Sequence, residues 1–251
     1  MGCTMTEFSP VELMTLHLKA AFTCDGNSRL LTVNEPWDGT VPAPRFFLGR
    51  TIDGCIIRKY RYDLDDALTE KLETLSGDEI KAAHFTEPPK HREKYLELLG
   101  AEKFSMGPCF MVPPRAGNER ADPRIEFVTR ETIGKYSIEG FEWLLDEIDL
   151  VQPCAGYVHE GRLVSQCRSV RISGAGIIPV RTFTGAIEAG VETLPGFRGR
   201  GYAPLVTAAW AAAVREQGAL PLYSTSWNND ASQRVAKKLG LYYYGNSFSV
   251  K

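Results

Sequence analysis

Apolar positions in the first half of the chain predict a hairpin, two helices and a strand. The segment RFFLGRTIDGCIIRKY (45–60) has extended runs on both sides of Asp53-Gly54, a pair typical of hairpin turns. Leucines then recur at helical spacing, at Leu64, Leu68, Leu72 and Leu75. HREKYLELLG (91–100) predicts a second helix that ends at Gly100, and GPCFMV (107–112) predicts a strand. This half is therefore a small α+β unit, in which we find no chemical motif.

The second half begins with a helical pattern and continues with strands. Residues 138–148 predict a helix, because one face would collect Phe141, Leu144, Leu145 and Ile148. AGYVHEGRLVSQCRSVRI (155–172) predicts two strands joined at Glu160-Gly161, and AIEAGVETL (186–194) predicts a third. The glycine-rich segment between them, 173–185, predicts a long hairpin connection.

A break in this pattern divides the chain nearly in half. The segment MVPPRAGNERADPR (111–124) gathers prolines and mixed charges without apolar periodicity, which is typical of a linker. We therefore expect an N-terminal α+β domain over residues 1–112, a linker over 113–125 and a second domain over 126–251.

Composition excludes several classes of function. The net charge is −2, so no global positive field would hold a nucleic acid. The six cysteines and four histidines show neither C-x-x-C nor H-E-x-x-H spacing, and we expect no metal. Because no apolar run reaches the ~18 residues of a membrane span and the N terminus lacks a signal-peptide pattern, we expect no membrane partner and a cytoplasmic location.

The stretch GFRGRGYA (196–203) lies between a predicted strand and a predicted helix. Pro204 suits the first turn of that helix, and Gly218 suits its end. A helix N terminus offers unpaired backbone N–H groups and the positive end of the helix dipole, and glycines let a phosphate approach the main chain. With Arg198 and Arg200 adding positive charge, the stretch predicts a pyrophosphate cradle.

Arg198-x-x-Gly201-x-Ala203 after a strand fits the pattern Q/R-x-x-G-x-G/A, and here the sequence resembles the GNAT superfamily of acetyl-CoA-dependent N-acetyltransferases. The order that follows is also similar to that family: a strand, PLYSTSW (221–227), a helix, NNDASQRVAKKLG (228–240), and a closing strand, LYYYGNSFSV (241–250). The resemblance covers roughly residues 126–251. A degenerate second copy of the same fold is one interpretation of the first half.

The resemblance implies an α/β (α+β) fold, with a mixed, mostly antiparallel sheet flanked by helices. Acetyl-CoA would lie in a V-shaped opening between strands 186–194 and 221–227, with its pantetheine arm paired to the main chain near Val191 and Thr193. The family motif implies that the cofactor is bound by Val191, Thr193, Arg198, Gly199, Arg200, Gly201, Tyr202, Ala203 and Asn228.

Catalytic residues follow less directly from the motif. Members of the family often take a base from a carboxylate on the strand at 186–194, where Glu188 and Glu192 are candidates that share one strand face unless a bulge intervenes. Of the two, Glu188 lies farther from the phosphate loop. The proton donor differs from the family pattern, because this chain has Ala236 where many members have a tyrosine. The candidate proton donors are instead Ser232, Tyr242, Tyr243 and Tyr244. Of these, Tyr242 and Tyr244 share one face of the predicted closing strand.

Two functions of different classes remain. The first is transfer of an acetyl group to the amine of a small molecule by direct attack in a ternary complex, since the sequence shows no Cys-His arrangement that would support an acyl-enzyme. The alternative is a non-catalytic CoA-binding sensor or interaction module, which the alanine at 236 favours. A homodimer is compatible with both, and the acceptor is not specified.

Overall fold

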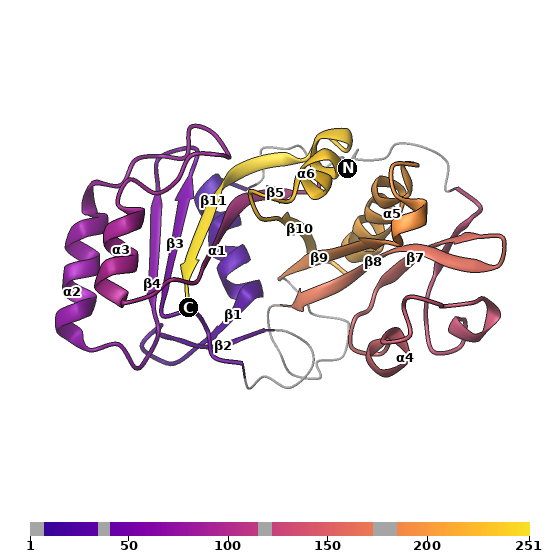
Figure 1. The fold of residues 1–251 in the computed structure, drawn as a ribbon, viewed down its shortest axis with the longest axis horizontal. Coiled ribbons are helices and arrows are strands. Elements are labelled where there is room, and N and C mark those ends of the chain that lie inside the picture. Colours follow the sequence, from indigo (N-terminus) through magenta and orange to yellow (C-terminus); the bar gives the residue numbers. More distant parts are fainter. Residues whose placement is uncertain (1–7, 35–40, 115–121, 173–184) are drawn as a thin grey trace.

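A computed structural model describes residues 8–34, 41–114, 122–172 and 185–251, and within them the chain builds one large sheet (Figure 1). This sheet has nine strands in the order β4-β3-β11-β5-β10-β9-β8-β7-β6. In that order their bounds are Ile56–Tyr60, Phe46–Thr51, Tyr242–Val250, Phe104–Met111, Leu220–Ser224, Ala186–Thr193, Arg162–Ile172, Cys154–His159 and Ile125–Phe127. A separate two-stranded sheet pairs β1 (Phe22–Cys24) with β2 (Leu30–Val33).

Pairing in the large sheet is mixed and mostly antiparallel. Among the described strands, β9 and β10 form the one parallel pair, and every other neighbouring pair is antiparallel. Helices flank this sheet on both faces. The predicted fold class is therefore confirmed.

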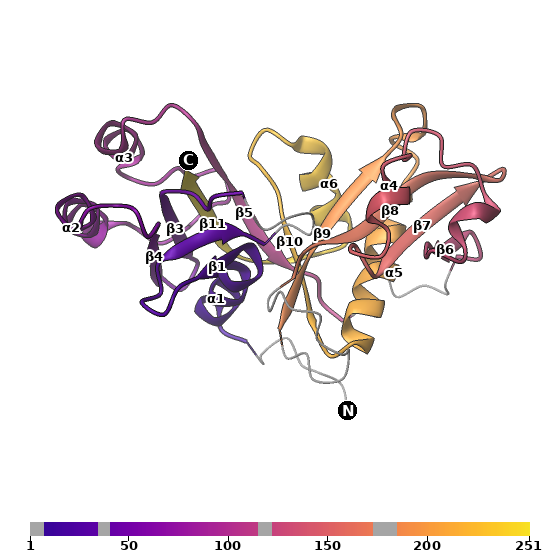
Figure 2. The ribbon, with the colours of Figure 1, turned by 90° about the horizontal axis from the view of Figure 1, so that it is seen from below.

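Alternate residues of the central strands face different helices. Leu222 packs beneath α1 (Pro10–Ala21), and we call this side the α1 face. Its neighbour Tyr223 packs against α5 (Tyr202–Glu216) and α6 (Asp230–Lys238), and we call that side the α5 face. Both α2 (Asp66–Leu75) and α3 (Arg92–Leu99) cover the outer strands β3 and β4, at the end of the molecule away from α5 (Figure 2).

The two halves of the chain share the large sheet. β5 comes from the first half, yet it pairs with both β10 and β11 of the second half. Figure 1 shows β5 and β11 side by side at the centre of the molecule. The expected linker at 113–125 therefore connects two neighbouring parts of one sheet, and its residues 115–121 lie outside the described residues.

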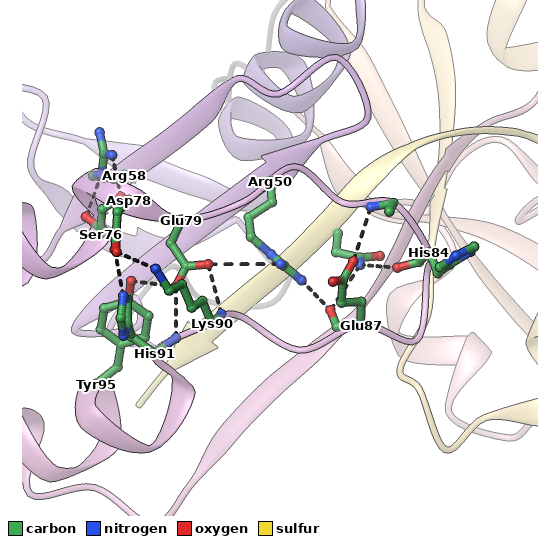
Figure 3. Close-up of polar contacts among 12 residues, drawn as sticks. Arg50, Arg58, Ser76, Asp78, Glu79, His84, Glu87, Lys90, His91 and Tyr95 are labelled. Atoms are coloured by element: carbon green, nitrogen blue, oxygen red, sulfur yellow. Dashed lines mark hydrogen bonds and ion pairs between the residues drawn. The ribbon is translucent and has the colours of Figure 1, made fainter.

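A buried arginine fixes the long connection between α2 and α3 to the sheet (Figure 3). Arg50 of β3 is 1% exposed, and its Nη1 lies 4.0 Å from Oε2 of Glu79. Its Nη2 donates a hydrogen bond to the main-chain oxygen of Glu87. Tyr95 of α3 donates to the other oxygen of Glu79 at 2.8 Å. Because the buried guanidinium lies beside a carboxylate and donates to a main-chain oxygen, we interpret this cluster as structural.

The prediction of a helix over residues 138–148 is wrong, because the helix in the structure is much shorter. The structure has turns up to Trp143 and a short helix, α4 (Leu144–Glu147). Gly140 adopts a φ of 90°, which ends any helical path there. Phe141 is fully buried as expected, but Leu145 is 46% exposed.

The other predicted elements are present where the structure describes them. The hairpins at 45–60 and 155–172 and the strand that begins at Ala186 are confirmed. The helices that follow 196–203 and 221–227 are also confirmed. The predicted connection at 173–185 lies, except for Gly185, outside the described residues.

Gly107 of β5 lies where the main chain after β10 passes closest. A Cβ added at Gly107 would lie 1.7 Å from the carbonyl oxygen of Thr225. Gly107→Ala would push the two segments apart, so we expect the free energy of unfolding to fall by about 1–3 kcal/mol in urea titrations. The control is Gly134→Ala, since nothing lies within 4 Å of the added carbon there. Equal unfolding free energies for Gly107→Ala and wild type would contradict the close approach.

Candidate functional site

Strands β9 and β10 stop pairing part of the way along their length. Their parallel ladder runs from Ala186–Leu220 to Glu188–Leu222. Beyond that point β9 continues to Thr193 and β10 to Ser224 without pairing to each other. The sheet therefore has an opening between two of its central strands, as the sequence predicted.

The N terminus of α5 faces this opening and carries no side-chain cap. Its N-cap is Gly201, with a φ of 86°, and Gly199 has a φ of 78°. By contrast, side chains cap α1, α2 and α6. The first N–H groups of an α-helix have no partner within the helix, so those of α5 are available to an anion.

A cleft of about 570 Å³ fills the space between β9, the loop before α5, β10 and α6. Most of the predicted cofactor-binding residues line it: Val191, Thr193, Arg198, Gly199, Gly201, Tyr202 and Ala203. Arg200 instead lies with its guanidinium 5.2 Å from the ring centre of Phe197. Asn228 accepts a hydrogen bond from Ser226 at 2.8 Å, and its neighbour Asn229 caps α6 and lines the cleft.

Positive charge outweighs negative charge on the cleft wall. Arg198, Arg234 and Lys238 line it, and Glu192 is the one carboxylate among the described lining residues. Sequence reasoning missed Arg234 and Lys238. Their spacing of four residues on a predicted helix was the available signal, because such a pair shares a helix face.

The candidate catalytic residues are divided between the two faces of the sheet. Glu192 and Ser232 line the cleft, and Ser232 Oγ lies 2.6 Å from Tyr223 Oη. Tyr244 is fully buried beneath α1, and Tyr242 packs against the same cluster. Burial raises the pKa of Tyr244 well above its usual range.

Glu188 is buried in contact with a histidine from the first half. Its side chain is 2% exposed, and Oε1 lies 3.3 Å from Nδ1 of His17 on α1. The other ring nitrogen of His17 lies 3.9 Å from Sγ of Cys109 on β5. Sequence gave no signal for this group, because its three members come from segments far apart in the chain.

Neighbouring charges shift the pKa of the buried His17 imidazole. Burial alone would lower the pKa of His17, but Cys109 and the Glu188 carboxylate outweigh it and raise the pKa to about 10. The raised pKa favours the protonated form of His17, in which it pairs with the carboxylate of Glu188.

Other kinds of site receive no support from the described residues. Within those residues, no three or more His, Cys, Asp or Glu side chains converge as a metal site requires. No helix in the same residues has the length and apolar character needed to cross a membrane.

Comparison with known proteins supports the motif. Residues 177–248 match the family model described as FR47-like protein, which is GNAT-related. This region is therefore similar to the GNAT superfamily, in agreement with the resemblance predicted from Arg198, Gly201 and Ala203. No curated protein matches the chain.

Several solved structures are similar to the chain at low sequence identity. An acetyltransferase of the GNAT family from Colwellia psychrerythraea is 15% identical, with 86% of this chain and 84% of that chain covered and a TM-score of 0.47. A putative GNAT acetyltransferase from Novosphingobium aromaticivorans is 15% identical, with 77% and 81% covered and a TM-score of 0.44. A GCN5-related N-acetyltransferase from Kribbella flavida is 18% identical, with 62% of each chain covered and a TM-score of 0.43.

The His17–Glu188 ion pair predicts a specific pH dependence of stability. Because the folded-state pKa of His17 is raised, the pair stabilises the fold fully below about pH 6.5 and loses this contribution as the pH rises through about 10. We expect the difference in unfolding free energy between wild type and His17→Gln to shrink across that range in urea titrations. The exposed His84 supplies the control, since His84→Gln should give a flat difference. A constant difference for His17→Gln would contradict the ion pair.

Proposed function

We propose that the protein is an acetyl-CoA-dependent N-acetyltransferase that acts on the amine of a small molecule. The observation that carries this proposal is the cleft between the separated ends of β9 and β10, into which the uncapped N terminus of α5 points. This geometry would combine an open strand edge with a site for an anion, and CoA likewise joins an extended pantetheine arm to a pyrophosphate.

The phosphate end of the cofactor would lie at α5. There the backbone N–H groups after Gly199 and Gly201 and the positive end of the helix dipole stabilise negative charge. Arg198 adds a cation from the loop, and Arg234 and Lys238 add two from α6. The cofactor therefore meets positive charge from two directions at its phosphates.

The pantetheine arm would lie along the unpaired edge of β9. Val191 and Thr193 line the cleft there, and their main chain lies beyond the last pairing with β10. An extended arm hydrogen-bonded to this edge acts as an added strand, so it satisfies backbone groups that β10 leaves open. The thioester would then lie toward Glu188, where the ladder ends.

Acetyl transfer follows as direct attack by the bound amine on the thioester. The amine must lose a proton, the carbonyl oxygen must be polarised and the departing sulfur must gain a proton. Glu192 lines the cleft, and Glu188 belongs to the last ladder pair, toward which the thioester would lie. Ser232 is the cleft-lining hydroxyl among the candidate donors, and its bond to Tyr223 orients it.

A non-catalytic CoA-binding module is the second candidate. Ala236, where many relatives have a tyrosine, is 3% exposed and packs in the core, so it supplies no proton to a leaving sulfur. Release of free CoA thiol from acetyl-CoA in the presence of a panel of amines separates the two candidates. Amine-dependent release supports the enzyme, and CoA binding without release supports the module.

Substitution of Gly201 tests the phosphate cradle. Wild type should bind CoA with micromolar affinity, about −8 kcal/mol. Gly201→Asp should abolish binding in calorimetry, because a carboxylate would take the place of the phosphate and repel it. Gly201→Asn is the matched control, because asparagine also tolerates a positive φ but brings no charge. Equal losses in the two variants would contradict the electrostatic argument.

The cations of α6 offer an independent test. Arg234→Glu should weaken CoA binding by at least tenfold, about 1.4 kcal/mol, and should flatten the dependence of the affinity on salt. Lys237→Glu makes a similar change of charge on the same helix at a position outside the cleft lining, and it should change the affinity much less. If the two variants behave alike, the cleft wall is not the binding surface.

A further inference from the structure

A second cavity, of about 660 Å³, lies on the α1 face of the sheet. Its floor includes Gly107 of β5 and Ser247 of β11, and α1 and the small sheet contribute His17 and Phe22 to its walls. The first cleft is lined by residues of the α5 face, such as Tyr223 and Val235. The two cavities therefore lie on opposite sides of the large sheet.

The two cavities meet at the opening in that sheet. Ser224, Thr225 and Ser226 line both of them. These residues follow Leu222, the last residue of β10 that pairs with β9. No ladder joins β9 to β10 beyond this point, so a thioester at the end of the first cleft faces the second cavity.

A titratable pair stands at this junction. His17 lines the second cavity, although it is only 3% exposed, and its Nδ1 lies 3.3 Å from Oε1 of Glu188. Glu188 belongs to the last ladder pair, so the imidazole lies beside the opening. Its Nε2 contacts only the weakly accepting sulfur of Cys109 among the described residues. This nitrogen can exchange that contact for a stronger partner in the cavity.

We propose that the cavity on the α1 face is the acceptor-binding chamber and that His17, held by Glu188, relays the proton that the acceptor amine loses to the departing sulfur. The inference rests on the proposed acetyl-CoA chemistry. It makes His17 a catalytic residue and Glu188 the residue that positions it.

The step balances without a further reactant. The free amine attacks the thioester carbonyl, so that a C–N bond forms, the C–S bond breaks and its electron pair stays on sulfur. Protonated His17 gives its Nε2 proton to the sulfur and regains one from the nitrogen. The products are the N-acetyl amide and CoA thiol, and His17 is again protonated. This route supplies the proton that the family's tyrosine would supply where this chain has Ala236.

The chamber walls define the class of acceptor. One wall is apolar, with Phe22, Val33 and Phe47, and hydroxyls line another, from Ser105, Ser247 and Ser249. The charged residues of the described lining, apart from His17, are Arg61 and Lys251, and it contains no carboxylate. Among the described lining residues a polyamine or an aminoglycoside would find no counter-charge, so we infer that the acceptor is a primary amine with an apolar body and no second cation.

The test measures binding and turnover with phenethylamine as the apolar monoamine and with spermidine and an aminoglycoside as polycations. Wild type saturated with acetyl-CoA should acetylate the monoamine at least tenfold more efficiently, in kcat/KM, than either polycation. His17→Gln should lower kcat by about 10²-fold while the KM for phenethylamine and the Kd for CoA change little. The matched control is the exposed His84→Gln, which should keep wild-type kinetics.

A variant that fills the chamber tests the location separately. Ser247→Phe should raise the KM for phenethylamine at least tenfold and leave the Kd for CoA unchanged. Ser105→Phe, at an exposed position of the same lining, serves the same purpose should Ser247→Phe destabilise the fold.

Different results overturn different inferences. If wild type binds no CoA, the proposed function fails first. If it binds CoA but prefers the polycations or acetylates no amine of the panel, the assigned acceptor class is wrong. Unchanged phenethylamine KM in a folded chamber-filling variant overturns the location. Wild-type kcat in His17→Gln, or an acetyl group trapped on Cys109, overturns the proton relay.

Discussion

The structure depends on the early end of one parallel ladder. β9 and β10 are hydrogen-bonded only as far as Glu188 and Leu222, although both strands continue. A central sheet normally leaves few backbone N–H and C=O groups unpaired, because each costs free energy when it is buried without a partner. Here the unpaired edge borders a cleft on one face and a cavity on the other, which lets a ligand supply the missing partners.

The sheet can open at this point because its other strands hold it together. β5 pairs with β10 on one side and with β11 on the other, so β10, which bounds the opening, stays attached to the rest of the sheet. This arrangement needs residues from both halves of the chain. It also needs Gly107, where a side chain would collide with the main chain after β10. The first half is therefore part of the framework of the site.

The first half also contributes an ionisable side chain next to the opening. α1 has a capping box formed by Ser9 and Glu12, and it delivers His17 to the α1 face. A buried ion pair is costly to desolvate and gives little net stability by itself. Its position at the end of the ladder gives a functional reason to retain it. Glu188 is one of the two candidate bases of the sequence analysis, and the structure shows this carboxylate in contact with an imidazole that lines the second cavity.

The sequence by itself determined what depends on local pattern. The strand, the glycine loop and the helix N terminus around Gly201 follow one another directly in the chain. The order of the residues alone therefore predicted the anion site. The hairpin at Glu160-Gly161 was equally local, and the helix predicted over 138–148 failed where one glycine broke the periodicity.

Only the tertiary structure decided that β5 completes the second half's sheet, that Arg234 and Lys238 face the cleft, and that His17, Cys109 and Glu188 meet. Those contacts join residues far apart in the sequence, and packing of the whole sheet, rather than any local preference, brings them together.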